Sequence, residues 1–225
     1  MKATIYGHAC VQLELAKSTL LFDPFISPNK LASHIDVQKL KPDYILLSHG
    51  HEDHMADLLT IQKNSGATVI CIAEIASWLS QKGVEQTHGM NIGGGYNFDF
   101  GGVKMVYALH SSSMPDGAYG GSPAGFVVYA DNKKIYFAGD TALTLDMKLL
   151  ADENLDWAIL PIGDNYTMGA DDAIRAAEFI NCKNIIGIHY NTFPVIQIDE
   201  EEVKEKFQKA GLNLQLVPIG DSIEL

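Results

Sequence analysis

Three histidines and two acidic residues lie within the six positions from His49 to His54, which have the sequence HGHEDH. The segment lies between two apolar runs. The run from Tyr44 to Leu47 predicts a strand, and the run from Met55 to Ile61 predicts a helix. So many ionisable side chains in one place cost free energy on folding unless they bind something. Imidazole nitrogens and carboxylate oxygens are ligands for zinc and related transition metals. The segment therefore predicts a metal site.

Three further residues of ligand type each come directly after an apolar run that predicts a strand. Side chains at strand ends can point into a cleft at the edge of a sheet. We therefore expect these three residues to converge with the histidine segment on one point. With the run that precedes each, they are His110 after 103–109, Asp140 after 135–138 and His189 after 184–188.

The elements that must position these side chains alternate between strands and helices. Two hairpins are expected, one that turns at Gly101-Gly102 and one that turns at Asp131-Asn132. Helices are predicted at 56–64, 74–81, 170–180 and 199–210, with a shorter helical piece at 145–150. Strands are predicted at 2–6, 10–15, 19–22, 44–48, 68–72, 96–100, 103–109, 125–130, 134–138, 157–161, 184–188 and 214–217.

The charge balance limits the partners of the chain. Its 225 residues include 16 basic and 28 acidic side chains, for a formal net charge of −12. A chain this acidic has no general attraction for nucleic acid or anionic membranes. Three separated cysteines, Cys10, Cys71 and Cys182, favour buried thiols in a reducing compartment over disulfides. With no pattern of a signal peptide or a membrane span, we expect a cytoplasmic protein with a small-molecule substrate and no nucleic-acid or membrane partner; homo-oligomers stay open.

The order and spacing of the ligand-type residues resemble the metallo-β-lactamase superfamily of binuclear metallohydrolases. The resemblance covers nearly the whole chain and rests on the His-x-His-x-Asp-His pattern, a strand-end histidine, a Gly-Asp-Thr sequence and a final strand-end histidine. More narrowly, four segments are similar to a UPF0173-like group of small metal-dependent hydrolases, which is related to the ascorbate-phosphate lactonase branch. These segments are Gly7 to Cys10, Asp23-Pro24, Gly89 to Gly94 and Leu160 to Gly163.

The resemblance implies an α/β fold with four layers, in which two packed β-sheets are flanked by helices, as one domain over residues 1–225. It also implies two divalent metal ions, with zinc preferred and manganese, iron or nickel as alternatives. A hydroxide between the two metals would attack a small ester, lactone or phosphodiester. The implied ligands are His49, His51 and His110 for the first metal, Asp53, His54 and His189 for the second, and Asp140 as the bridge.

Other residues near this site have roles that the resemblance leaves less defined. Asp53 and the bridging Asp140 would both be catalytic residues, and Asp53 would relay a proton to the leaving group. His8 follows the first predicted strand and could serve as an acid or a substrate contact, or it could be a structural histidine. Asp23 could hydrogen-bond a ligand histidine or cap its own loop. Glu52 does not occupy a ligand position and is expected to face solvent or to support the ligands indirectly.

Two other classes of function remain open besides hydrolysis. A metal-binding or regulatory protein could keep the ligand set without turnover, but a site that drifts in this way would be expected to lose a ligand. A diiron redox protein could use a related set, but oxygen reductases with this pattern carry a glutamate in place of His51. His34 is expected to be exposed, and the loop from Asn165 to Met168 could shape the substrate pocket.

Overall fold

Two seven-stranded β-sheets form the centre of the protein in the computed structural model, which describes residues 1–225. The strand order is β14-β1-β2-β3-β4-β5-β6 in the first sheet and β13-β12-β11-β10-β9-β8-β7 in the second. The first sheet consists of β1 (Lys2–Gly7), β2 (Cys10–Glu14), β3 (Thr19–Phe22), β4 (Tyr44–Leu46), β5 (Thr68–Ile72), β6 (Thr87–Met90) and β14 (Ser222–Glu224). The second sheet consists of β7 (Gly95–Phe98), β8 (Gly101–Tyr107), β9 (Ala124–Ala130), β10 (Lys133–Phe137), β11 (Trp157–Pro161), β12 (Asn184–Ile188) and β13 (Asn213–Gln215).

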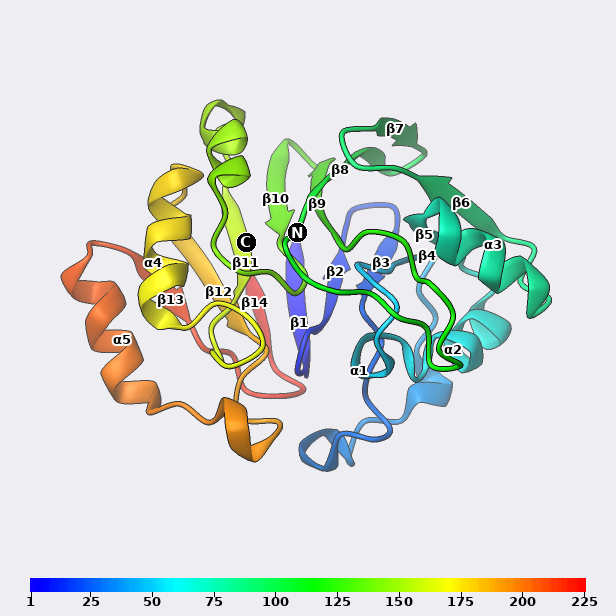
Figure 1. Cartoon of the computed structure of the whole chain (residues 1–225), viewed down its shortest axis with the longest axis horizontal. Helices are drawn as coiled ribbons and strands as arrows, with labels where there is room; N and C mark the ends of the chain where they lie inside the picture. Colours follow the sequence, from blue (N-terminus) through cyan, green and yellow to red (C-terminus); the bar gives the residue numbers. More distant parts are fainter.

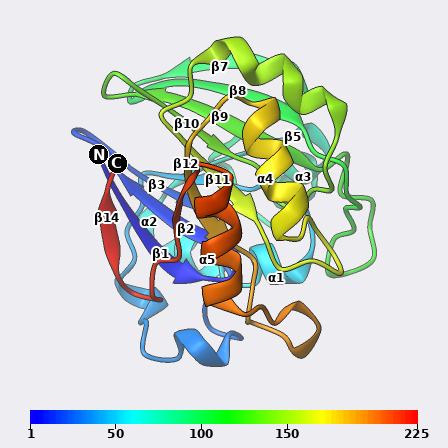
Figure 2. The same cartoon turned by 90° about the vertical axis from the view of Figure 1, so that its left-hand side faces the viewer.

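Helices cover the outer face of each sheet, so the predicted four-layer α/β architecture is confirmed (Figures 1 and 2). The first sheet is covered by α2 (Leu58–Ser65) and α3 (Ala73–Gln81), and the second by α4 (Ala170–Phe179), α5 (Glu200–Lys209) and the 3-10 helix η3 (Leu145–Glu153). The remaining short elements are η1 (Lys30–Ala32), η2 (Val37–Lys39), α1 (Glu52–Met55) and η4 (Pro194–Ile196). None of these helices has the length and apolar character needed to cross a membrane.

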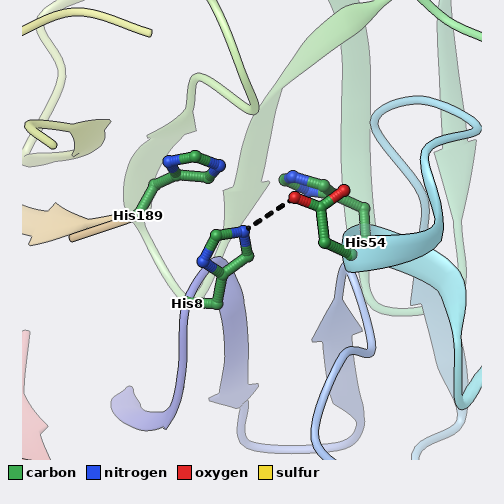
Figure 3. A group of neighbouring side chains, drawn as sticks. His8, His54 and His189 are labelled. Carbon is green, nitrogen blue, oxygen red and sulfur yellow. Dashed lines mark hydrogen bonds and ion pairs between the residues drawn. The ribbon is translucent and has the colours of Figure 1, made fainter. Parts of the chain in front are cut away.

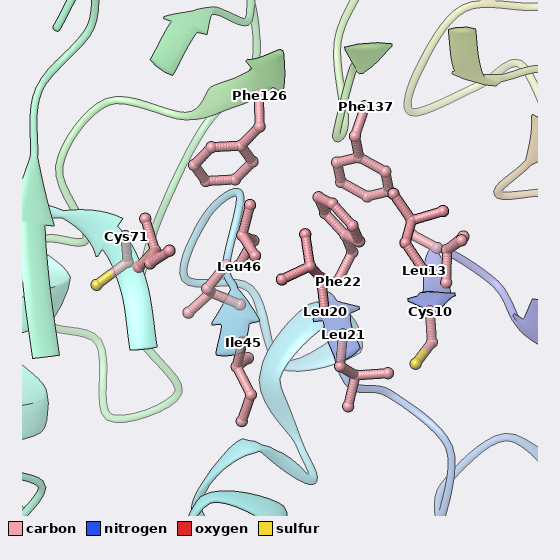
Figure 4. Close-up of a cluster of buried hydrophobic side chains, with 14 of the residues drawn as sticks. Cys10, Leu13, Leu20, Leu21, Phe22, Ile45, Leu46, Cys71, Phe126 and Phe137 are labelled. Atoms are coloured by element: carbon pink, nitrogen blue, oxygen red, sulfur yellow. The ribbon is translucent and has the colours of Figure 1, made fainter. Parts of the chain in front are cut away.

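The two sheets pack against each other through large apolar side chains. Phe22 on β3 contacts Phe137 on β10 with ring centroids 4.6 Å apart, and Phe126 on β9 lies on its other side at 6.4 Å. Figure 4 shows Phe126 and Phe137 of the second sheet facing Phe22 and the leucines of the first. All three rings are fully buried, and burial of each such side chain is worth about 1.5–3 kcal/mol. This core holds the two sheets in a fixed relation, and so also holds the loops at their edges.

The direction of the strands brings the ligand-type residues to one edge. The strands β3, β4 and β5 are parallel to one another, and β1 runs the same way because both β1 and β3 pair antiparallel with β2. In the second sheet β10, β11 and β12 are parallel, and β8 points the same way because it and β10 both pair antiparallel with β9. The carboxyl ends of these strands carry the loops that build the site.

One of the two predicted hairpin turns is correct and the other is wrong. Asp131 and Asn132 link β9 to β10 with φ of 50° and 59°, the left-handed pair that suits a tight hairpin. The turn between β7 and β8 instead lies at Asp99-Phe100, because Phe98 pairs with Gly101. Gly101 serves a close approach: a Cβ there would lie 2.1 Å from the carbonyl oxygen of Tyr129. The strands β6 and β14 were not predicted.

Candidate metal centre

The predicted ligands come from loops of both sheets and meet between the sheets. His49 follows β4 of the first sheet, while His110, Asp140 and His189 follow β8, β10 and β12 of the second. The helix α1 then carries Asp53 and His54 over the same point. The structure thus brings together residues from four separate stretches of the sequence. Within the cluster they form two groups, with Asp140 between the groups.

The first group is formed by His49, His51 and His110, whose ligand atoms all lie within 4.8 Å of one another. The Nε2 atom of His49 lies 3.0 Å from Nδ1 of His51. The His110 ring stands nearly perpendicular to both, with centroids 5.2 and 5.1 Å away. Burial lowers the pKa of each of these three imidazoles. Neutral imidazole is the form that binds a metal ion.

The second group contains Asp53, His54 and His189, with His8 beside them, again with ligand atoms within 4.8 Å of one another. Figure 3 shows the rings of His8, His54 and His189 turned toward a common space. The side chains of His54 and His189 are 0% and 1% exposed, whereas that of Asp53 is 33% exposed. This group is therefore deep on its histidine side and open on its carboxylate side.

Asp140 lies between the two groups. Its Oδ2 atom is 3.6 Å from Nε2 of His110 in the first group. The same oxygen is 3.3 Å from Nε2 of His54 and 3.0 Å from Nε2 of His189 in the second. Burial alone would raise the pKa of the Asp140 carboxyl, but the His189 and His54 rings hold it well below its usual range. An ionised carboxylate at this point can face a positive charge in either group.

Several buried polar atoms at this point have no hydrogen-bond partner in the protein, which tests whether a metal ion would fit. A buried polar atom without a partner costs about 1–3 kcal/mol. A divalent cation would accept lone pairs from His54, from Asp140 and from one ring nitrogen of His189, and mixed imidazole and carboxylate donors suit zinc and its neighbours. The site therefore fits metal ions by the chemistry of its donors. The unpartnered atoms are Nε2 of His54, Oδ1 of Asp140, and Nδ1 and Nε2 of His189.

A hydrogen-bond network behind the first-sheet histidines sets their orientation. Nδ1 of His54 donates to Oδ2 of Asp23 at 2.7 Å, and the hydroxyl of Ser48 donates to the same oxygen at 2.5 Å. Because the Ser48 proton is used in this way, its oxygen accepts from Nδ1 of His49 at 2.9 Å. Both histidines are thus held through Nδ1 and turn Nε2 toward the cluster, the usual support of a metal-bound imidazole. This resolves the open role of Asp23, whereas the part of Ser48 was not predicted.

Tight contacts between loops hold Asp140 in place. Gly139, with φ of +62°, has no room for a side chain, since a Cβ there would lie 2.8 Å from Cβ of Ser48 in the other sheet. The next residue but one, Thr141, accepts a hydrogen bond from the backbone N–H of Leu109 at 3.0 Å. Its carbonyl accepts from Met168 N–H, also at 3.0 Å. The Gly-Asp-Thr sequence therefore joins the loop before His110 to the loop from Asn165 to Met168.

His8 lies beside the second group rather than apart from it. Its Nε2 is 3.2 Å from Oδ2 of Asp53, and its backbone carbonyl accepts a 2.8 Å hydrogen bond from the N–H of His189. Burial lowers the pKa of its ring to about 4, so the ring is neutral at neutral pH. A cavity of about 200 Å³ adjoins His8, with Leu31, Tyr190 and Glu200 among its lining residues.

Backbone strain marks three residues of this region. His8, Asp23 and His189 have φ of 53°, 42° and 58°, in the left-handed region that residues other than glycine seldom adopt. Such conformations persist where surrounding contacts enforce them, and they are frequent at functional sites. By contrast, Glu52 and His34 are exposed, as expected, and take no part in the cluster.

Comparison with known proteins identifies the family of the chain. Residues 18–190 match the family model described as the Beta-lactamase superfamily domain. Proteins named UPF0173 metal-dependent hydrolase are similar: one from Christiangramia forsetii is 52% identical with all of both chains covered. Another, from Enterococcus faecalis, is 53% identical over 85% of this chain and 87% of its own.

Among solved structures, a metallo hydrolase from the hyperthermophilic archaeon Ignicoccus hospitalis superposes with a TM-score of 0.89 at 34% identity, covering 100% of this chain and 98% of its own. Agreement in sequence therefore extends over the whole chain, and agreement in fold includes both sheets. On these grounds the chain belongs to the β-lactamase superfamily and, within it, to the UPF0173 metal-dependent hydrolases.

Proposed function

We propose that the protein holds two divalent metal ions, most favourably zinc, and hydrolyses a small ester, lactone or phosphodiester. The first ion would be held by His49, His51 and His110, and the second by Asp53, His54 and His189. Asp140 would bridge them. The observation that carries the proposal is the position of Asp140, whose single oxygen Oδ2 faces histidines of both groups within 3.6 Å.

When bound, a pair of divalent cations supplies a water molecule activated at neutral pH and polarises the oxygen of the substrate's electrophilic group. The chain's own residues fix where this happens. Asp140 holds its ionised carboxylate between the groups, and Asp23 orients His54 from behind. The partly exposed carboxylate of Asp53 is suited to carry a proton from the water side to the leaving group.

The charge of the chain favours a small substrate. The chain's net charge of −12 gives no general attraction for polyanions, so a nucleic-acid polymer is disfavoured. The cavity of about 200 Å³ beside His8 is lined by none of the proposed metal ligands and therefore sets no limit on the substrate. A small molecule that presents one hydrolysable group fits the charge of the chain.

The test is a substrate screen with purified protein of known metal content. The panel contains generic phosphodiesters, lactones, esters and thioesters, each assayed with the zinc-loaded protein, the chelated protein and the protein reloaded with zinc. We expect turnover of one class that disappears on chelation and returns on reloading. Two bound metals per chain with no turnover across the panel would instead favour a metal-binding protein without hydrolytic activity.

A further inference from the structure

We propose that Thr192 and His8 form a positioning pair that orients Asp53 toward the second metal. The pair connects the two sheets, because Thr192 lies in the loop after β12 and His8 in the turn between β1 and β2. The inference rests on the proposed two-metal site, and it concerns residues outside the implied ligand set. It also separates two roles for His8, as a direct ligand and as a support for a ligand.

The hydrogen bonds of His8 define which atom carries the proton. Nε2 of His8 faces Oδ2 of Asp53 at 3.2 Å, and Nδ1 faces the hydroxyl of Thr192 at 3.0 Å. A carboxylate only accepts hydrogen bonds, so Nε2 must be the protonated nitrogen. In the neutral ring Nδ1 is then an acceptor, and the hydroxyl of Thr192 donates to it. The carbonyl of Tyr190, at 3.4 Å from the same hydroxyl, is the more distant acceptor.

This chain of donors leaves the other oxygen of Asp53 free for a metal ion. The Thr192 hydroxyl fixes the tautomer of His8, and His8 Nε2–H holds Oδ2 of Asp53, so Oδ1 is the oxygen left to bind. A protonated Nε2 has no lone pair to offer, which argues against His8 as a ligand. The pair thus does for Asp53 what Asp23 does for His54, with Thr192 of the second sheet behind His8 of the first.

The surroundings of His8 keep its ring from turning away. The ring is buried, its centroid lies 4.0 Å from that of His189, and Phe25 and Phe193 pack on it at 5.4 and 5.3 Å. Its backbone carbonyl also binds the N–H of His189 at 2.8 Å. A change at Thr192 removes the hydroxyl donor but leaves these contacts, so its effect should be confined to the tautomer of His8 and the orientation of Asp53.

The experiment compares Thr192→Val, Thr192→Ser and the wild-type chain by zinc titration of the metal-free protein. Stoichiometry is confirmed by elemental analysis after dialysis. In Thr192→Val we expect the second zinc to bind up to about 10-fold more weakly, the lower end of the usual effect of losing a direct partner of a ligand, because Thr192 acts on Asp53 through His8. The first zinc should bind as in the wild type, and Thr192→Ser, which keeps the hydroxyl, should restore the second. The matched control is Thr4→Val, which removes a hydroxyl on β1 that is bonded to Ser222 on β14 at 2.8 Å and contacts no residue of the site, and should leave both affinities unchanged.

Two results would overturn the inference. One is a second zinc affinity in Thr192→Val equal to that of the wild type. The other is equal weakening in Thr192→Val and Thr192→Ser, which would assign the effect to packing rather than to the hydroxyl. A wild-type chain that takes only one zinc would instead contradict the proposed function, so the two failures are distinguishable.

The variant His8→Gln separates support from direct ligation, because the Gln amide can still donate to Asp53. We expect two zinc ions per chain in this variant, with the second bound more weakly. Complete loss of the second zinc, with a melting temperature like that of Thr192→Val, would identify His8 as a ligand and contradict its assignment as a positioning residue.

Discussion

The two ligand groups on either side of Asp140 are built differently. In the first group, His51 is only partly buried and His110 is 14% exposed. His49 is held from behind by Ser48 at 2.9 Å, and His51 has a longer contact of 3.4 Å with the hydroxyl of Ser111. In the second group, His54 and His189 are almost fully buried, and Asp23 fixes His54 by a buried hydrogen bond. The histidines of the second group are thus the more deeply buried and rigid pair, although its carboxylate Asp53 is 33% exposed. We expect the second metal to be bound more tightly and the first to exchange more readily with solvent and chelator.

The largest effect should come from the residue that both groups share. Asp140→Ala removes the buried carboxylate that faces His54, His110 and His189. We expect loss of at least one metal and abolition of hydrolysis, measured by elemental analysis and by assay on whichever substrate class the screen identifies. Retention of two metals with full activity would contradict the bridging role.

Removing one ligand from each group should separate the two metals. His110→Ala should lose the first metal and keep the second, which is held by the more rigid group. His189→Ala should lose the second and also weaken the first, because Asp140 then lacks its 3.0 Å neighbour. Zinc titration of each variant measures this. If both variants bind two zinc ions with wild-type affinity, the groups are not the metal sites.

Removal of metal should lower the melting temperature. A ligand that binds only the folded state at 100 times its Kd stabilises that state by about 2.7 kcal/mol. In the metal-free chain the buried unpartnered atoms of His54, Asp140 and His189 also lose the partner that offsets their desolvation. Thermal unfolding of the same preparation before chelation, after chelation and after reloading provides the comparison. An unchanged melting temperature would argue that no metal occupies the buried group.

A substitution at Asp23, behind the second group, should lower the affinity of that group for its metal without removing a ligand. Asp23→Asn replaces a carboxylate that accepts from Ser48 and His54 by an amide that accepts more weakly and can present a donor instead. We expect the affinity for the second metal to fall about 10–100-fold, with a smaller change at the first through Ser48 and His49. If the affinity for the first metal fell more than that for the second, Asp23 would support the first group more than the second, contrary to the comparison above.

The smallest effect should come from Glu52, which lies within the histidine segment but is exposed. Glu52→Gln keeps the shape of the side chain and removes only its charge. We expect unchanged metal content and a change in the free energy of unfolding of no more than about 0.5 kcal/mol, as is usual for exposed positions. Loss of a metal in this variant would give Glu52 the ligand role that its position in the segment does not predict.

The sequence predicts a turn or a strand correctly where the residue types alone determine it. It fails where contacts with distant parts of the chain determine the structure. The Asp131-Asn132 turn was predictable because both residues tolerate positive φ. The Gly101-Gly102 turn was wrong because Gly101 is required by the close approach of Tyr129 from the neighbouring strand, which no local pattern reveals. The strand β6 has the sequence THGM, which lacks the alternation of apolar and polar residues that predicts a strand.

The same distinction applies to the candidate metal centre. Histidines and carboxylates at strand ends can be identified in the sequence by their type and spacing, and the structure brings them together. Ser48 and Thr192 cannot be identified in this way, because serine and threonine are common residues. Their roles depend on partners far away in the sequence, Asp23 for Ser48 and His8 for Thr192. The tautomers of His8 and His49 likewise follow from hydrogen bonds between loops, which only the folded chain defines.

The most direct test of a two-metal centre bridged by Asp140 is anomalous diffraction from crystals of the zinc-loaded protein, recorded at the zinc absorption edge. We expect two zinc peaks per chain about 3.5–4 Å apart. One peak should lie against His49, His51 and His110, the other against Asp53, His54 and His189, with the Asp140 carboxylate between them. A single peak per chain, or two peaks too far apart for one carboxylate to reach both, would contradict a two-metal centre bridged by Asp140.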